Sequence, residues 1–342
     1  MPGPSRIVKH TVVSSGLHDA DIRPPDLLEA FKQLSLRDAA AFFGAPDALE
    51  QVPCPACGAD NPAYAFEKDG YHFQDCGQCQ SRYVSPRPRA DALKRYHAES
   101  EASRFRASRF AEGAAAQRRH HLLRANAAWI ARIVAETGLP PGAAYADCRT
   151  YAPELFDEIA DLGCFGPLYA IAPWNPVAGR CKTPVAEARL DSPLALDAIS
   201  AFEKLEHQHA PLELLHAIAT RLNPGGLLFL TTRTCSGFDL QILGEKAPYI
   251  FVPEHLNLLS IAGLEHLATR AGFDIIELST PGQLDVELVA HASAADPSIV
   301  LPPFIKILIG DRGPRAHADF QEFLQKHRLS SHVRLALKKA ST

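Results

Sequence analysis

Four of the eight cysteines form two CxxC pairs, and this spacing is the most specific local signal in the chain. Cys54 and Cys57 make up the first pair, and Cys76 and Cys79 follow after eighteen intervening residues. Two such turns can hold four thiolates tetrahedrally around Zn²⁺. Four protein ligands leave no open position for a substrate, so we expect a structural zinc ribbon over residues 51–90. Redox-active pairs or free thiols are the alternative interpretation.

Between the two pairs the sequence alternates aromatic and polar residues, which is typical of a β-hairpin. Gly58 and Gly77 follow directly on a cysteine and ease the tight turns around the ligands. The ribbon is expected to end at residues 85–88, where two prolines exclude a helix.

After residue 139, short apolar runs alternate with helical patterns. This order predicts an α/β fold in which a largely parallel sheet is covered by helices on both faces. Ligands of such sheets bind at the carboxyl ends of the strands, so we expect the site there. The apolar runs that predict strands are residues 143–147, 167–173, 194–202, 226–232, 273–280 and 332–339.

The rest of the chain is expected to be helical. Residues 1–50 predict one or two short helices that pack locally, and residues 91–138 predict an amphipathic helical connector. With the ribbon and the α/β domain of residues 139–342, the chain therefore divides into four segments, while its length of 342 residues suits roughly two domains.

Composition excludes several functional classes. A net charge of −4 disfavours nucleic-acid binding, which depends on a basic surface that neutralises phosphates. The sequence contains neither a signal-peptide core nor an apolar run of about 18 residues, so we expect a cytoplasmic protein that does not bind a membrane. A reducing compartment agrees with a metal site. We expect the partner to be a small-molecule acceptor or another protein.

A set of ordered motifs in the α/β domain carries a family resemblance. Together they resemble the class I S-adenosylmethionine-dependent methyltransferases, and with the preceding ribbon they are similar to the zinc-ribbon members related to sugar and other small-molecule methyltransferases. The motifs are FEKLEH at 202–207, LNPGG at 222–226, PEHLN at 253–257, RAGF at 270–273, the segments 280–286 and 329–333, and the ribbon exit at 83–88.

This resemblance implies a Rossmann-like sheet of seven strands with the last strand inserted antiparallel. It also implies that S-adenosylmethionine lies across the ends of the first, second and fourth strands. Asp147 would contact the cofactor from the end of the first strand, and Phe202 and Glu203 would contact it from the end of the fourth.

Two of the expected cofactor positions depart from the family pattern. Glycines normally follow the first strand, because backbone without Cβ must approach the methionine part of the cofactor. Here Arg149 and Tyr151 occupy that turn and project toward the cofactor space, and Ala172 replaces the acidic residue that normally binds the ribose from the second strand. The loss of a hydrogen-bonded carboxylate costs about 1.5–3 kcal/mol, so we expect non-standard cofactor binding. A shifted alignment of the second strand is the alternative.

Three further residues are catalytic candidates. Glu254 and His255 resemble the Glu-His pair of small-molecule methyltransferases, in which the carboxylate orients a histidine that acts as general base. A loop histidine bonded to backbone is the alternative. His207 belongs with Glu203 and Glu206 to an ExxEH cluster, which resembles the divalent-metal cluster of small-RNA 2′-O-methyltransferases. Helix capping and substrate contact are the alternative roles.

The leading functional hypothesis is a methyltransferase that acts on a small molecule, such as a sugar or a sugar nucleotide. The second hypothesis is a non-catalytic scaffold or regulatory partner in which Arg149, Tyr151 and Ala172 close the cofactor pocket. A different enzyme that reuses the fold is the third, because a fold does not fix a function.

Overall fold

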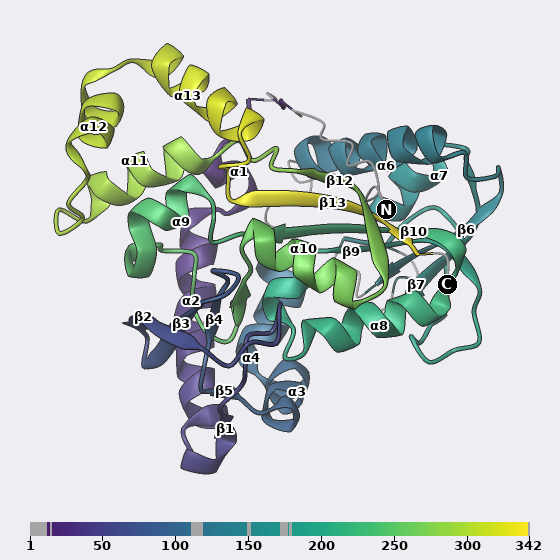
Figure 1. The fold of residues 1–342 in the computed structure, drawn as a ribbon, viewed down its shortest axis with the longest axis horizontal. Helices are drawn as coiled ribbons and strands as arrows, with labels where there is room; N and C mark the ends of the chain where they lie inside the picture. The colour runs from purple at the N-terminus through teal and green to yellow at the C-terminus, as the bar shows by residue number, and fades with distance from the viewer. Residues whose placement is uncertain are drawn as a thin grey trace.

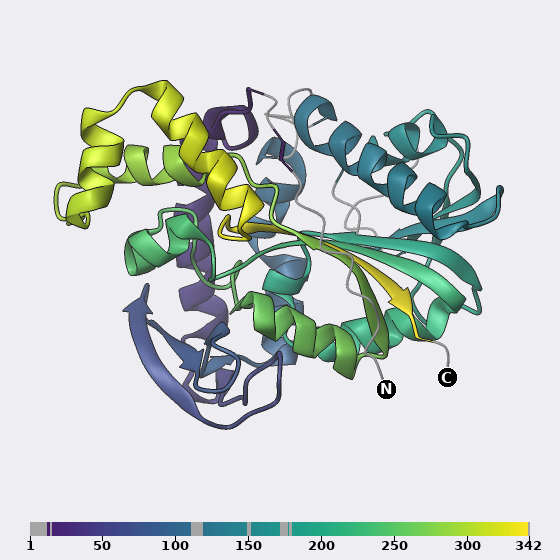
Figure 2. The ribbon, with the colours of Figure 1, turned by 45° about the horizontal axis from the view of Figure 1, so that its top comes forward.

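A computed structural model describes residues 12–13, 16–110, 119–148, 152–171, 177 and 180–340. Within these residues, a large seven-stranded sheet carries helices on both faces, and a smaller four-stranded sheet lies toward one end of it (Figures 1 and 2).

The large sheet has the order β12-β13-β10-β9-β6-β7-β8. Strand β13 runs antiparallel to both of its neighbours, and the other pairs are parallel. The expected α/β fold with an antiparallel last strand is therefore confirmed. The strands are β6 (Ala143–Cys148), β7 (Phe165–Ile171), β8 (Ala186–Ala188), β9 (Leu196–Phe202), β10 (Leu222–Arg233), β12 (Phe273–Ser279) and β13 (His332–Lys339).

Helices α6 (Arg124–Thr137) and α7 (Leu155–Ala160) cover one face, while α8 (Pro211–Arg221) and α10 (Ile261–Arg270) cover the other (Figure 2). Strand residues alternate between the faces, as the pleat requires. Phe229 packs against Trp129 of α6 with ring centres 5.3 Å apart, whereas Leu228 belongs to the core beneath α8 and α10. Helix α6 ends at Gly138, whose φ of 69° suits the residue after a helix.

The LNPGG motif lies at the start of β10. Gly225 has a φ of 74°, and the pairing of β10 with β9 is irregular between Leu222 and Leu227. The motif therefore forms a bulge within the strand, which glycine permits at a positive φ.

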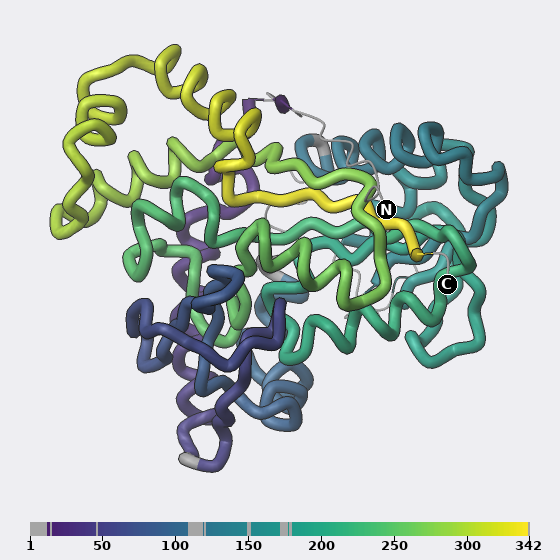
Figure 3. Tube along the Cα trace, in the orientation of Figure 1, coloured from purple at the N-terminus to yellow at the C-terminus, as the bar shows by residue number. Residues whose placement is uncertain are grey.

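The smaller sheet contains the ribbon. Its strands are β2 (Pro62–Lys68), β3 (Tyr71–Cys76), β4 (Arg82–Val84) and β11 (Asn257–Leu258), in the order β11-β4-β3-β2. Strands β2 and β3 form the expected hairpin, whose turn residues Asp69 and Gly70 both have positive φ. Strand β11 comes from the α/β part of the chain, which the tube in Figure 3 shows returning to pair with the ribbon.

Helices before and after the ribbon pack together. They are α1 (Asp19–Ile22), α2 (Pro25–Phe43) and η1 (Pro46–Ala48), then α3 (Ala90–Glu99), α4 (Glu101–Phe105), η2 (Arg106–Phe110) and η3 (Arg119–Leu123). The short strands β1 (Leu49–Glu50) and β5 (Arg87–Pro88) pair on the ribbon side. Packing of the N-terminal helices is not only local, because the Phe31 ring of α2 lies 5.7 Å from the Phe251 ring.

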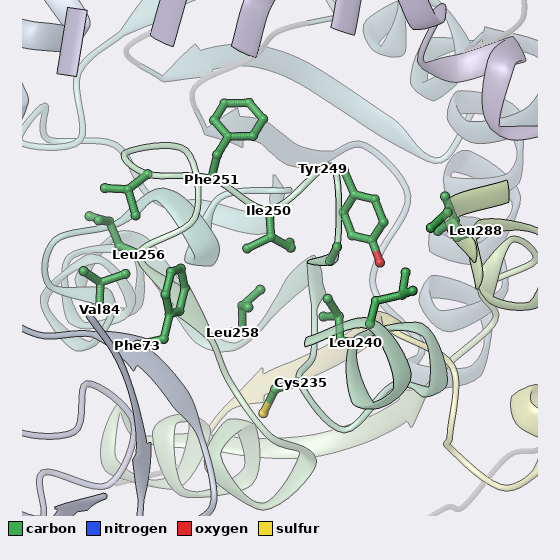
Figure 4. Packing of buried hydrophobic residues seen from close by; sticks show 14 of the residues in the cluster. Phe73, Val84, Cys235, Leu240, Tyr249, Ile250, Phe251, Leu256, Leu258 and Leu288 are labelled. Carbon is green, nitrogen blue, oxygen red and sulfur yellow. The ribbon is translucent and has the colours of Figure 1, made fainter. Parts of the chain in front are cut away.

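One buried apolar cluster joins the ribbon to the α/β part of the chain. Figure 4 shows Phe73 and Val84 of the ribbon beside Leu256, with Ile250 and Phe251 from the preceding loop. Burial of such side chains stabilises the contact by roughly 1.5–3 kcal/mol each. The ribbon is therefore docked on the segment that follows α9 (Phe238–Leu243) and η5 (Gly244–Lys246).

A helical insertion separates β12 from β13. It consists of α11 (Asp285–Ala295), α12 (Pro303–Lys306), η6 (Ile307–Asp311) and α13 (Pro314–Lys326), and it projects from one end of the sheet (Figure 1). A short η4 (Leu205–His207) follows β9. Among the helices of the described ranges, none combines the length and the apolar character that crossing a bilayer needs.

Candidate functional site

A cavity of about 270 Å³ lies at the carboxyl edge of the large sheet. The ends of β6, β9 and β10 form its base, together with the beginning of β13, which runs in the opposite direction. This is the edge at which α/β sheets bind ligands. Its apolar walls come from other segments: Leu17 and Ile22 near the N-terminus, Leu122 and Leu123 before α6, and Leu284 and Leu288 of the insertion.

The Asp147 carboxylate reaches this cavity from the end of β6. The residue is only 4% exposed, and its Oδ1 accepts a hydrogen bond from the Ser200 hydroxyl of β9. The Tyr145 and Ser200 hydroxyl oxygens lie 2.5 Å apart, so three polar groups form a chain across two strands. Such a chain holds the carboxylate in one orientation.

Phe202 and Glu203 line the cavity from the end of β9. The backbone of Glu203 has a φ of 50°, which is uncommon for a residue with a side chain and is concentrated at functional sites. Two bonds to Thr231 hold this conformation: the Glu203 N–H donates to the carbonyl at 2.9 Å, and the Thr231 hydroxyl donates to Glu203 Oε1 at 2.8 Å.

The structure thus brings Asp147, Phe202 and Glu203 to one cavity. Arg149, Tyr151 and Ala172, the other three residues expected at the cofactor, lie outside the described residues.

His332 is a cavity residue that sequence reasoning did not select. Its Nδ1 lies 3.5 Å from Glu203 Oε1. Burial lowers the pKa of His332 to about 4; Glu203 opposes this, while Arg334 and Arg233 lower the pKa further. The imidazole is therefore neutral at pH 7. In the sequence, residues 329–333 only form part of the family resemblance, but the antiparallel direction of β13 places the beginning of that strand at the ligand-binding edge of the sheet.

Several cations also line the cavity. Arg233 is the last residue of β10 and Arg23 comes from the N-terminal segment, and their guanidinium groups lie 4.3 and 5.2 Å from the centre of the Tyr249 ring. Arg23 pairs with Asp19 at 2.5 Å, and Arg233 lies 3.8 Å from Asp239. Lys204 and Arg334 border the cavity as well. The N-terminal segment, expected to be an independent helical part, thus contributes directly to the site.

Asp285 lines the side of the cavity formed by the insertion. It accepts hydrogen bonds from the Ser330 hydroxyl at 2.6 Å, from the Ser331 N–H at 2.6 Å and from the Gln321 amide at 2.8 Å. Burial, together with the smaller effect of the Asp239 charge, raises the pKa of Asp285 to about 6.

Glu254 lies beside the cavity in a buried polar cluster. Its carboxylate forms an ion pair with Arg106, and its carbonyl oxygen contacts Nδ1 of His207. Burial raises the pKa of Glu254, and the Arg106 charge opposes that shift. Arg106 contacts one oxygen of the Glu254 carboxylate, and the expectation that Glu254 orients His255 stays a prediction.

His255 is half-buried between two rings: His207 at 5.8 Å and Phe251 at 6.0 Å. Burial, together with the smaller effect of the Arg233 charge, lowers the pKa of His255 to about 3. His207, Glu254 and His255 do not belong to the cavity lining as described. The catalytic roles expected for these three residues stay predictions.

Glu203, Glu206 and His207 do not converge as metal ligands. Glu206 accepts a hydrogen bond from the Thr232 hydroxyl at 2.8 Å, while His207 turns its Nδ1 toward the Glu254 carbonyl. Burial raises the pKa of Glu206 well above its usual range, and Glu203 adds to the shift. The metal-binding interpretation of this cluster is therefore not supported.

The four ribbon cysteines do converge. Their sulfur atoms all lie within 4.8 Å of one another, with Cys54 and Cys79 at 3.6 Å and Cys57 and Cys76 at 3.5 Å. In the part of the chain that is described, no other group of three or more His, Cys, Asp or Glu side chains meets this distance. Four thiolates around Zn²⁺ at about 2.3 Å would lie roughly 3.8 Å apart, so this donor set fits the ion.

The ribbon is fixed to the α/β part of the chain through α10. Arg270 donates to the Ala56 carbonyl at 2.6 Å, and the Ser260 hydroxyl donates to the Cys79 carbonyl. Gly263 lets the helix approach closely, because a Cβ there would lie 1.9 Å from the Ser81 hydroxyl oxygen.

Comparison with known proteins agrees with this architecture. Residues 118–278 match a family model described as a methyltransferase domain. The match covers slightly less than half of the chain, so these residues are similar to a methyltransferase domain. The matched residues include α6 and the strands from β6 to β10, which carry Asp147, Phe202 and Glu203.

Curated relatives match parts of the chain. The ubiquinone biosynthesis O-methyltransferase of Chromobacterium violaceum is 28% identical over 121 residues, which are 34% of this chain and 52% of that protein. The protein of the same name from Xanthomonas euvesicatoria is 38% identical over 101 residues, 28% of this chain and 42% of that protein. This chain thus spans about half the length of these relatives or less.

Solved structures similar to the chain include the plantazolicin methyltransferase BpumL in complex with SAH. It has 12% identity and a TM-score of 0.45, covering 73% of this chain and 94% of that chain. The mycolic acid cyclopropane synthase CmaA1 complexed with SAH and CTAB has 13% identity and a TM-score of 0.40, covering 61% of this chain and 83% of that chain.

Proposed function

We propose that the protein transfers a methyl group from S-adenosylmethionine to a small molecule in the cavity at the carboxyl edge of the sheet. The observation that carries this proposal is the joint presence of Asp147, Phe202 and Glu203 at the cavity of a domain that is similar to a methyltransferase domain. When bound, S-adenosylmethionine supplies an electrophilic methyl group. Asp147 is suited to hold it, because a buried carboxylate with a fixed orientation is a strong hydrogen-bond acceptor.

The acceptor atom is proposed to be a hydroxyl oxygen. The curated relatives are named as O-methyltransferases, which supports this choice. A sugar or sugar nucleotide fits the proposal, and so does a phenol. Apolar side chains such as Leu122, Leu284 and Leu288 would exclude water from the acceptor and from the reacting methyl group.

Two histidines are candidates for the group that takes the acceptor proton. His332 is favoured over His255, because His332 lines the cavity and has the Glu203 carboxylate beside its Nδ1. A neutral imidazole whose second nitrogen is oriented by a carboxylate is suited to this task.

Calorimetry with S-adenosylmethionine and S-adenosylhomocysteine tests cofactor binding. We expect binding by the wild type and a loss of affinity of about 10- to 100-fold in Asp147→Asn, since one charged hydrogen bond contributes about 1.5–3 kcal/mol. Asp161→Asn, a change of the same kind outside the cavity, is the matched control. An absence of heat at millimolar ligand would remove the methyltransferase proposal and favour a non-catalytic scaffold.

A second experiment separates the two histidines. Hydroxylated small molecules are incubated with S-adenosylmethionine, and methylated products are detected by mass spectrometry. With the acceptor so found, His332→Asn should lower kcat by about 10²-fold, whereas His255→Asn should change it by less than about 10-fold. The opposite order of effects would assign the base to His255.

A structural zinc ion is part of the proposal. It would be held by Cys54, Cys57, Cys76 and Cys79, whose mutual distances support tetrahedral ligation. Zinc would do no chemistry, because four thiolates leave no open position. Reduced thiols require a reducing compartment, which is consistent with a cytoplasmic protein.

A further inference from the structure

Arg334 is a buried guanidinium group at the cavity. The residue is 8% exposed and lines the cavity from β13. Its Nη2 donates to the side-chain oxygen of Asn126 at 3.0 Å, and the group lies 5.4 Å from the centre of the Trp129 ring. Its Nε has no hydrogen-bond partner in the described part of the chain. The guanidinium is thus held in place with part of its donor capacity unused.

The acidic residue whose charge acts on Arg334 is Glu277, which already has other partners. Glu277 accepts hydrogen bonds from Arg132 at 2.7 Å and from the Trp129 indole at 3.1 Å. Among the described residues, no carboxylate lies within 4.0 Å of Arg334. Burial lowers the pKa of Arg334 to about 10, so the group stays charged at pH 7. A buried charge without a counter-charge is unfavourable, which indicates that a bound anion completes this site.

The other two arginines of the cavity differ in this respect. Arg23 pairs with Asp19 at 2.5 Å, and Arg233 has Asp239 at 3.8 Å. Arg334 is therefore the cavity arginine that, within the described ranges, has no carboxylate within 4.0 Å and feels only the more distant charge of Glu277. A planar guanidinium is also suited to bind the two oxygens of a carboxylate or phosphate side by side.

Resting on the function proposed above, we infer that the methyl acceptor carries an anionic oxygen group, a carboxylate or a phosphate, which Arg334 binds. His332 stands two residues before Arg334 on β13, so both side chains leave the same face of the sheet about 7 Å apart. An acceptor anchored by its anion at Arg334 would then place a hydroxyl near the His332 ring. The anion selects the acceptor and the histidine receives its proton.

Probe binding to the full chain, saturated with S-adenosylhomocysteine, tests this inference. Benzoate and inorganic phosphate serve as anionic probes, and benzamide serves as the neutral counterpart of benzoate. We expect a saturable stabilisation in thermal unfolding with at least one of the two anions and none with benzamide. Equal effects of benzoate and benzamide, together with no effect of phosphate, would overturn the inference without the use of any variant.

Substitutions of Arg334 test whether this residue binds the anionic probe. Arg334→Gln should lower the affinity for the anion that binds by about 10-fold or more. Arg334→Lys keeps the positive charge but loses the two parallel N–H donors of the guanidinium, so it should lower the affinity less. Arg189→Gln, at an exposed surface pair with Asp191, is the control that should leave probe binding unchanged. Undiminished probe binding by folded Arg334→Gln contradicts the inference.

The cofactor also carries a carboxylate, so its own affinity is measured in each variant. If Arg334→Gln weakens S-adenosylhomocysteine about 10-fold or more and leaves the probes unaffected, the anion belongs to the cofactor and the acceptor assignment is wrong. If wild type binds no cofactor yet binds the probe through Arg334, the proposed methyl transfer fails while the anion site stands.

Discussion

The Arg87 guanidinium donates a hydrogen bond from Nη2 to the Asn257 side-chain oxygen at 3.2 Å, and it does so from a position that is only 1% exposed. Its Nη1 also donates to the His209 carbonyl at 2.8 Å. The Asn257 amide in turn donates to the carbonyls of Leu205 and Gln208 at 2.8 and 2.7 Å. One arginine from the ribbon exit therefore ties together the segments after β9 and before β11, which carry Glu203, His207, Glu254 and His255.

Replacement of Arg87 by alanine should lower the free energy of unfolding by about 2–4 kcal/mol, because buried carbonyl and amide oxygens lose their donor. Urea unfolding measures this change. Arg89→Ala is the matched control, since that side chain is half-exposed and its ion pair with Glu50 spans 3.9 Å; its effect should stay below about 1 kcal/mol. Equal effects of the two substitutions would contradict the role given to Arg87.

The purified protein should contain about one equivalent of zinc by elemental analysis. Cys57→Ala should lose the metal and lower the midpoint of thermal unfolding, because zinc binding contributes directly to folding. Cys164→Ser is the control, since Cys164 lies outside the ribbon and should leave the zinc content unchanged. Metal-free protein that unfolds at the same temperature as the zinc-bound form would argue against a structural ion.

Gly263→Ala should detach the ribbon from α10. The added Cβ would lie 1.9 Å from the Ser81 hydroxyl oxygen and 3.2 Å from the Ala56 Cβ, so helix and ribbon must move apart. We expect faster hydrogen exchange of the ribbon amides, measured by mass spectrometry. Gly310→Ala, where nothing lies within 4 Å of the new Cβ, should leave exchange in the ribbon unchanged; protection that persists in Gly263→Ala would refute close docking.

Stability should fall as the pH falls from about 6.5 toward 4. Burial lowers the pKa values of His332 and His255 to about 4 and about 3, so in this range the unfolded chain binds protons at these rings that the folded chain does not. The contribution of these two histidines to the free energy of unfolding is complete above pH 6.5 and is lost as the pH falls. The charged groups around His332 are Glu203 and the arginines Arg23, Arg233 and Arg334.

Urea unfolding at a series of pH values measures this linkage. His332→Gln should reduce the pH slope by about one proton over that range. Asp285 has the opposite effect on stability, because burial raises its pKa to about 6. Its contribution to the free energy of unfolding is complete below the pKa of the unfolded chain and is lost as the pH rises through 6. Asp285→Asn should therefore steepen the slope, and an unchanged slope in His332→Gln would mean that its ring is not held neutral.

Sequence periodicity predicted most of the large sheet. Runs such as 143–147 and 226–232 fall on β6 and β10, because strands buried on both faces are continuously apolar. The short edge strand β8 was not predicted, since Ala186–Ala188 has no apolar run of useful length. The pairing of β11 with the ribbon was not predicted either, because two residues carry no periodicity.

Some residues of the candidate site could be located from the sequence, and others could not. Asp147 and Glu203 could be located from sequence, because each ends a predicted strand and such ends converge on one edge of the sheet. Arg23 and Arg334 could not be located from the sequence. Arg23 lies in the N-terminal segment and Arg334 lies within a strand, and only the tertiary fold brings them together. The partner of Glu254 is likewise a long-range contact, with Arg106 placed 148 positions earlier in the chain.

The position of β13 has a consequence for how the chain acquires its fold during synthesis. This strand lies between β10 and β12, yet its residues are translated after those of all other strands of the sheet. Until residues 332–339 emerge from the ribosome, β10 and β12 both present a row of unpaired backbone donors and acceptors, which is a template for intermolecular pairing. The part of the cavity that contains His332 and Arg334 therefore forms only after the last strand of the sheet has been made, and a chain terminated before this strand would be an aggregation-prone product.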